Sequence, residues 1–166
     1  MKLWSKENTA TSRSIEKFTV GKDREMDLYL SAFDILGSLA HTTMLESVGL
    51  LTQEELVVLK EELRNIYTQV QEGNFTLADN VEDIHSQIEL LLTEKLGDTG
   101  KKIHSARSRN DQVLVDIKLF LRNEIEELVL AVQPFFNILG QEIDIHRPLR
   151  QADDQKQPAH KNGKSD

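Results

Sequence analysis

Residues 104–113 read His-Ser-Ala-Arg-Ser-Arg-Asn-Asp-Gln-Val, and they stand directly before a long stretch of helical apolar spacing. A guanidinium can hold a carboxylate through two parallel hydrogen bonds. Free backbone N–H groups at a helix start also favour an anion. The run therefore predicts a site for a small molecule that carries carboxylates. By composition alone it fits equally well a polar helix start that Ser108 or Asn110 caps.

Apolar residues follow helical spacing on both sides of this run, without any strand pattern or internal repeat. After an irregular arm at residues 1–22, we expect an all-α chain. Its first helix should bury Met26, Tyr29, Leu30, Phe33, Leu36, Leu39, Ala40 and Met44. The expected helices are Asp23–Ser47, one from Thr52 to just before Gly73, Val81–Leu96, and one from Ser108–Asn110 to about Ile143. Thr52 and Glu55 have the spacing of a capping box at the start of the second helix.

The last expected helix is too long for three shorter helices to cover. One side of it carries Val113, Ile117, Phe120, Leu121, Ile125, Leu128, Val132, Phe135 and Leu139. Helices of this kind pack in bundles or against partner chains. From about Asp144 the sequence has no aromatic residue and no helical apolar spacing, so we expect residues 144–166 to form a disordered tail.

Composition narrows the class of protein. A net charge of -8 over 166 residues argues against nucleic-acid binding. The absence of cysteine excludes disulfides and thiolate metal sites. No metal-ligand spacing links the histidines. We find neither a signal peptide at the N-terminus nor an apolar run long enough to span a membrane, and we expect a cytoplasmic protein.

The order Ser108-Arg109-Asn110-Asp111-Gln112-Val113 closely resembles the signature of the argininosuccinate lyase family, within the fumarase/aspartase superfamily. The resemblance covers roughly residues 1–142. It includes Lys2-Leu3-Trp4, the helix from Asp27 to Gly37-Ser38, Gly49-Leu50-Leu51-Thr52, and Glu82-Asp83-Ile84-His85. It implies a small N-terminal helical domain at 1–106, the first long helix of a central bundle at 107–143, and a divergent tail at 144–166. It also implies a homotetramer assembled through the long helices.

The resemblance implies β-elimination of argininosuccinate to arginine and fumarate, in arginine biosynthesis, without a cofactor or metal. Arg109 and Asn110 would hold the substrate's carboxylates, with Ser108 in a weaker role. Asp27 would contact the amino-acid end of the substrate, unless it is only a solvated charge. His85 and His104 match family histidines that could act as acid, base or donor. For each of them a structural polar contact is the alternative, and for Arg109 the alternative is a salt bridge with Asp111 or Asp116.

The family's later blocks, Pro-Gly-Tyr-Thr-His-Leu-Gln and a Ser-Ser loop, are absent from these 166 residues. We therefore expect a truncated form that is inactive alone, whether it arises from a frameshift, a gene truncation or a shortened product. A non-catalytic module that pairs with a full-length lyase subunit is the alternative. Ala106 stands where the family usually has glycine, so a loop that needs positive φ would be strained there.

Overall fold

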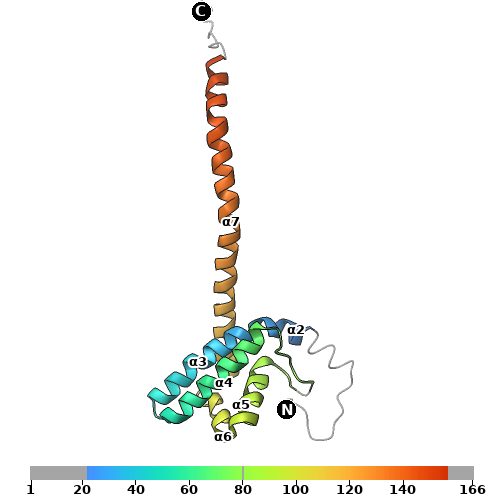
Figure 1. The fold of residues 1–166 in the computed structure, drawn as a ribbon, viewed down its shortest axis with the longest axis vertical. Coiled ribbons are helices and arrows are strands. Elements are labelled where there is room, and N and C mark those ends of the chain that lie inside the picture. The colour runs from blue at the N-terminus through green and yellow to red at the C-terminus, as the bar shows by residue number, and fades with distance from the viewer. Residues whose placement is uncertain (1–21, 80, 157–166) are drawn as a thin grey trace, which may run out of the picture. The chain divides into compact units, whose positions relative to one another are not determined.

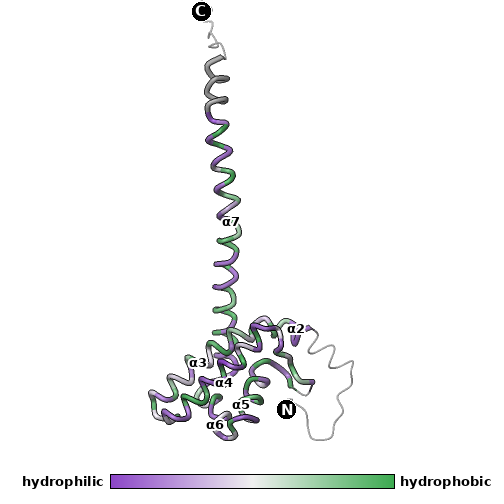
Figure 2. The backbone as a smooth tube through the Cα atoms, in the orientation of Figure 1, coloured by the Kyte–Doolittle hydropathy of each residue, from purple (hydrophilic) through white to green (hydrophobic). Residues whose placement is uncertain are grey.

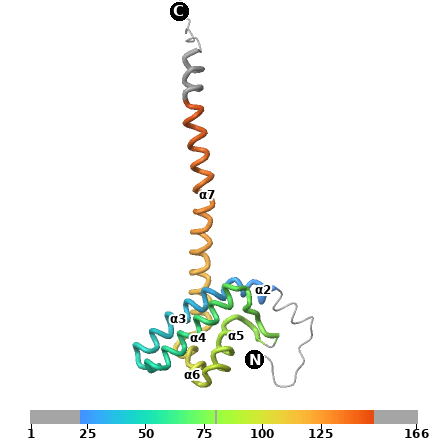
Figure 3. The backbone as a smooth tube through the Cα atoms, in the orientation of Figure 1, coloured from blue at the N-terminus to red at the C-terminus, as the bar shows by residue number. Residues whose placement is uncertain are grey.

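The computed structural model describes residues 22–79 and 81–156, with side chains described as far as residue 147. These residues form helices and loops without a strand, as the all-α prediction required (Figure 1). The chain path can be followed in Figure 3. The expected arm and the Lys2-Leu3-Trp4 motif lie outside the described residues. The elements are α2 (Asp23–Asp27), η1 (Leu28–Leu30), α3 (Ser31–Ser47), α4 (Gln53–Gln71), α5 (Ile84–Leu96), α6 (Asp98–Lys101), η2 (Lys102–His104) and α7 (Arg109–Lys156).

Helices α3 and α4 form an antiparallel pair that holds much of the core (Figure 1). The predicted capping box starts α4: the Thr52 hydroxyl accepts the Glu55 N–H at 3.2 Å, and the Glu55 carboxylate accepts the Thr52 N–H at 3.0 Å. Burial of each large apolar side chain contributes about 1.5–3 kcal/mol. The core consists of Ile35, Leu45, Leu51, Leu59, Leu63, Ile66, Phe75, Ile84, Ile88, Leu92 and Ile103.

The first helix differs from its prediction in the face that it buries. It is divided into α2, η1 and α3, and the expected core residues Met26, Tyr29, Leu36 and Met44 are 55%, 66%, 43% and 39% exposed. The buried face of α3 instead carries Ser31, Asp34, Ile35, Ser38, Thr42 and Leu45. The spacing of apolar residues predicted the wrong face. Asp34 has hydrogen-bond partners on α5 and α7, and these make burial of the polar face possible.

Helix α5 ends at Gly97, as predicted, with φ 62° at this residue. The expected loop after it is helical, and it forms α6 and η2. A Cβ atom on Gly100 would lie 2.3 Å from the carbonyl oxygen of Leu92. Only glycine therefore allows α6 to fold back against α5 at this point.

Helix α7 starts at Arg109, within the predicted range. The Ser108 hydroxyl accepts the Asp111 N–H at 3.2 Å, and the Asp111 carboxylate accepts the Ser108 hydroxyl at 2.8 Å. The chain divides into two compact units at Leu121/Arg122, so α7 belongs to both. Most of its apolar side chains are exposed, from Ile117 (38%) to Leu128 (63%) and Phe135 (62%). Figure 2 shows the alternation of apolar and polar residues along this helix.

The prediction that the long helix ends near Ile143 is wrong, because α7 continues to Lys156. Residues 144–156 are therefore helical, and residues 157–166 lie outside the description. Gln, Glu, Arg, Lys, Leu and Ala make up nine of the sixteen residues 141–156 and favour a helix, whereas Pro148 in the same segment opposes one. Glu142 and His146 also pair at 3.4 Å across one turn. The domain boundaries at 106/107 and 143/144 stay predictions.

Ala106 provides a test of strain in the loop before α7. Its φ is 57°, which is the left-handed conformation expected at a position where the family usually has glycine. Glycine adopts this conformation without the clash that a Cβ creates. We expect Ala106→Gly to raise the free energy of unfolding by about 1 kcal/mol. Urea denaturation at neutral pH would measure the change.

Ala40→Gly is the matched control, because Ala40 is exposed in the middle of helix α3. There glycine should lower the free energy of unfolding by about 1 kcal/mol. Equal destabilisation by both substitutions would contradict the strain at Ala106.

Candidate functional site

The amino end of α5 gathers the first group of charged residues. The Asp83 side chain caps this helix by accepting the Ser86 N–H at 2.8 Å. Asp27, from α2, accepts the Ile84 N–H at 2.7 Å. Burial raises the pKa of the Asp27 carboxyl, while the hydrogen bond from Ile84 opposes the rise. Asp27 is therefore not a freely solvated charge: it completes the first turn of α5, where a negative charge is favourable.

Arg109 reaches this helix end from the start of α7. Its Nη1 pairs with the Asp83 carboxylate, and its Nη2 donates to the Ser86 hydroxyl at 2.5 Å. The predicted alternative, a salt bridge with Asp111 or Asp116, is wrong, since Asp83 is the partner. The Arg109 side chain remains 31% exposed. The guanidinium is thus held in one orientation and still reachable from solvent.

The neighbours of Arg109 have different environments. Asn110 is exposed at the first turn of α7. Ser108 caps this helix together with Asp111. Ser108 therefore caps the helix, and its substrate contact, like that of the exposed Asn110, stays a prediction.

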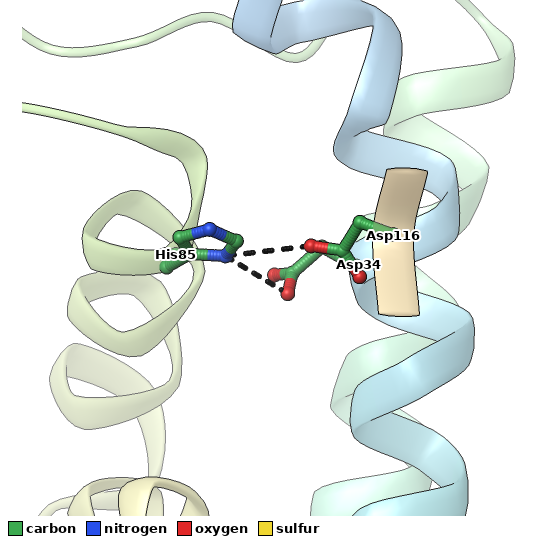
Figure 4. A group of neighbouring side chains, drawn as sticks. All are labelled: Asp34, His85 and Asp116. Atoms are coloured by element: carbon green, nitrogen blue, oxygen red, sulfur yellow. Dashed lines mark hydrogen bonds and ion pairs between the residues drawn. The ribbon is translucent and has the colours of Figure 1, made fainter. Parts of the chain in front are cut away.

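A second, buried group of polar residues lies where α3, α5 and α7 meet. The His85 Nδ1 atom is 3.0 Å from Asp34 Oδ1 and 3.7 Å from Asp116 Oδ2. Figure 4 shows the imidazole facing the two carboxylates. Gln112 donates its amide N–H to the same Asp34 oxygen as His85. We call Asp34, His85, Gln112 and Asp116 the buried polar cluster.

Charges in this cluster shift each other's protonation. Burial alone would lower the pKa of His85, but the hydrogen bond and charge of Asp34, with the charges of Asp83 and Asp116, raise it. Burial and the neighbouring charge of Asp34 raise the pKa of Asp116 to about 7. Near neutral pH the Asp116 carboxyl can therefore keep its proton, and a protonated carboxyl can donate a hydrogen bond.

The sequence suggests that Gln112 orients neighbouring groups, and its amide does contact Asp34. Sequence reasoning missed Asp34 and considered Asp116 only as a surface partner of Arg109. A signal was present, since Asp116 occupies the apolar side of its helix three residues after Val113 and four before Phe120. Phe120 packs edge-on against Phe33 of α3, with ring centroids 5.8 Å apart. A carboxylate on a buried helix face requires a partner or a proton.

The other candidate histidine, His104, lies apart from the cluster. It is exposed in η2, and within the described residues no hydrogen bond connects it to the buried polar cluster. The loop that follows is tied to α3 instead. His41 lies with its Nε2 2.9 Å from the Ser105 carbonyl, and Arg107 donates to the Ser38 hydroxyl at 3.2 Å. Arg107 thus holds the loop in place.

A cavity of about 120 Å³ opens beside the cluster. Its walls come from α3, the loop before α7 and the first turns of α7. Buried acceptor atoms without a hydrogen-bond partner among the described residues include Asp34 Oδ2, Gln112 Oε1 and both carboxylate oxygens of Asp116. The cavity is lined by Gly37, His41, Arg107, Asp111, Gln112, Val115 and Asp116. It borders Gln112 and Asp116, although both remain buried.

The sequence of this helical chain matches a known family of enzymes. A family model described as Lyase matches residues 5–147, and the chain belongs to this family. The match ends close to the predicted limit of the resemblance, about residue 142. No helix in the described part of the chain combines the length and hydropathy needed to cross a membrane.

The curated relatives are named argininosuccinate lyase, which confirms the predicted resemblance to the N-terminal part of these proteins. One from Parabacteroides distasonis is 61% identical over 138 residues, covering 83% of this chain and 31% of the relative. One from Phocaeicola vulgatus is 59% identical over 138 residues, again covering 83% of this chain and 31% of the relative. One from Thermotoga neapolitana is 46% identical over 135 residues, covering 80% of this chain and 34% of the relative. The chain therefore spans about a third of the length of these relatives.

Asp116 should make the stability of the protein depend on pH. Its pKa rises from 3.8 to about 7 on folding, so between these values the folded state binds more protons than the unfolded state. The free energy of unfolding then falls as pH rises through this window, by about 1.4 kcal/mol at most for each pH unit. The raised pKa of His85 acts in the same direction.

We expect Asp116→Asn, which mimics the protonated acid, to be more stable than the unmutated chain at pH 8, with a difference that shrinks toward pH 4. Denaturation in metal-free buffer at several pH values would show it. Asp98→Asn is the control, because the Asp98 carboxylate is exposed and pairs only with Lys101 in its own helix. Parallel pH profiles for Asp116→Asn and the unmutated chain would contradict the buried titration.

Proposed function

We propose that this chain forms the N-terminal part of an argininosuccinate lyase, a cytoplasmic enzyme of arginine biosynthesis that splits argininosuccinate into arginine and fumarate. One observation carries the proposal: Arg109 is fixed and solvent-accessible at the start of α7, beside Asn110, in a chain whose relatives bear this name. Two adjacent donors at a helix start suit a substrate with several carboxylates.

The reaction removes a proton from the carbon next to one carboxylate. The electron pair left behind forms the carbon–carbon double bond of fumarate as the bond to the guanidino nitrogen breaks, and arginine departs. Negative charge accumulates on the carboxylate before that bond breaks. Fixed cations and N–H donors lower the energy of such a state because they need no rearrangement when the charge appears.

Arg109 can supply such donors although Asp83 already contacts it. A guanidinium has five N–H donors, and the contacts with Asp83 and Ser86 use two of them. Three donors remain for a substrate carboxylate. In this arrangement Asp83 and Ser86 orient Arg109, and the amide of Asn110 adds a further donor from the next residue along the helix.

The other proposed residues act around this pair. Asp27 uses one carboxylate oxygen for the Ile84 N–H, and its second oxygen is available to the amino-acid end of the substrate. His85 is held by Asp34, so we assign it a positioning role with respect to α7. His104 remains a candidate acid or base because its side chain is exposed, next to the loop that leads to α7.

The apolar side of α7 supports a proposal about assembly. Side chains such as Ile125, Leu128 and Phe136 are 59%, 63% and 68% exposed, which isolated soluble helices rarely sustain. We propose that they pack against the long helices of other lyase segments in a homotetramer. A non-catalytic module that pairs with a full-length lyase subunit is the alternative, and no specific observation favours it.

A polypeptide of these 166 residues should release no detectable fumarate from argininosuccinate. The proposed donors bind and orient substrate, and the relatives' remaining two thirds are not represented in it. Absorbance of fumarate in the ultraviolet would measure the reaction, with the Parabacteroides distasonis lyase as the positive control. Turnover by the purified polypeptide would show that this chain contains a complete catalytic site.

Arg109 can be tested in a chimera in which residues 5–147 of this chain replace the matching residues of the Parabacteroides distasonis lyase. We expect the chimera to be active and Arg109→Ala to lower kcat/KM by about 10²–10³-fold, since a charged donor to the transition state is lost. Arg109→Lys should recover only part of the activity, because lysine cannot form the same paired contacts.

Arg64→Ala is the matched control, because Arg64 is an exposed arginine on α4, outside the proposed site. It should leave kcat/KM unchanged. An active chimera in which Arg109→Ala behaves like Arg64→Ala would contradict the proposed role of Arg109.

A further inference from the structure

We propose that Asp34, His85 and Asp116 form a metal site that accepts Zn²⁺. One ligand atom from each residue lies within 4.8 Å of the others, and all three residues are buried. The ligands come from three different helices, α3, α5 and α7 (Figure 4). The proposal goes beyond lyase activity and does not depend on it.

The spacing of the ligand atoms fits a tetrahedral ion. Zinc binds imidazole nitrogen and carboxylate oxygen at about 2.0–2.2 Å, so neighbouring ligand atoms in a tetrahedron lie about 3.4 Å apart. The distances from His85 Nδ1 to Asp34 Oδ1 and to Asp116 Oδ2 are 3.0 and 3.7 Å, on either side of this value. Since every pair of these ligand atoms lies within 4.8 Å, side-chain rotations would place all three atoms around one ion.

Unsatisfied acceptors lie in the same place, where the positive charges of His85 and Arg107 act on Asp116 but donate no hydrogen bond to it. Asp116 is 0% exposed, and within the described residues neither of its carboxylate oxygens has a hydrogen-bond partner. Gln112, which is not a member of the three, is 6% exposed and also has an unpartnered oxygen. Two buried carboxylates balance the charge of one divalent ion, whereas their isolated burial is costly.

The surroundings supply the remaining requirements of a metal site. The Gln112 amide donates to Asp34, and such a contact orients a ligating carboxylate. The cavity lined by Gln112 and Asp116 offers an entry path and room for a water as fourth ligand. Arg107 and Asp111 also line this cavity.

The test uses the full 166-residue chain after treatment with a chelator. Competition with a chromophoric chelator should show one Zn²⁺ bound per chain in the micromolar range or tighter, and Zn²⁺ should raise Tm. Asp116→Asn should weaken Zn²⁺ binding by at least about 100-fold and abolish the Tm shift. Far-UV circular dichroism would establish that the variant is folded.

His146→Gln is the control for adventitious binding, because His146 and Glu142 form an exposed pair on α7 that could also hold zinc. It should leave the tight site intact. If Asp116→Asn does not fold, the visible spectrum of Co²⁺ in the unmutated chain decides, and intense tetrahedral bands are expected. No saturable binding, a weak Co²⁺ spectrum, or binding lost only in His146→Gln would overturn the proposal.

Discussion

The arrangement of α3, α5 and α7 depends on the hydrogen bonds that the buried carboxylate of Asp34 accepts. This carboxylate accepts hydrogen bonds from His85 on α5 and from Gln112 on α7, and it lies on the inner face of α3. Three helices therefore meet through one buried group. A charged acceptor surrounded by low dielectric holds its donors more tightly than a neutral one does in water. The start of α7 is consequently fixed by polar contacts as well as by apolar packing.

The position of Arg109 follows from this constraint. Gln112 fixes the first turn of α7 through its bond to Asp34, while Asp83 and Ser86 hold the guanidinium at the amino end of α5. The same helix thus supplies His85 to the interior and Asp83 to the surface. A shift of α5 would therefore move both His85 and Asp83. We infer that the proposed donors are pre-positioned by the fold, which is what stabilisation of a developing charge requires.

Local signals in the sequence were sufficient for the helices with clear ends. Thr52 and Glu55 located the start of α4, and Gly97 the end of α5, because capping is decided within one turn of the chain. The buried face of α3 could not be obtained in this way. It depends on partners 51 and 78 residues away, at His85 and Gln112, whose presence makes the burial of Asp34 possible.

In the candidate site too, the sequence predicts local features but not contacts between distant residues. The motif identified Arg109 and Asn110, yet Arg109 pairs with Asp83, a contact across 26 residues that spacing alone does not reveal. The end of α7 was missed for another reason. Residues 144–156 lack an apolar face, and apolar spacing reports burial, so this pattern cannot locate the end of a helix whose side chains are not buried.

The composition of the α3 face indicates what this part of the molecule is built for. If stability alone determined it, apolar residues would fill the space between α3, α5 and α7, since buried ionic groups seldom stabilise a fold more than packed hydrocarbons. Instead the more apolar side of this helix is exposed at Leu36 and Met44, and Asp34 points inward. Such a conflict between local preference and burial is typical of places where a protein carries function. Here Asp34 contacts Gln112, three residues after Arg109 on the same helix, so the buried polar group and the proposed donor share the start of α7.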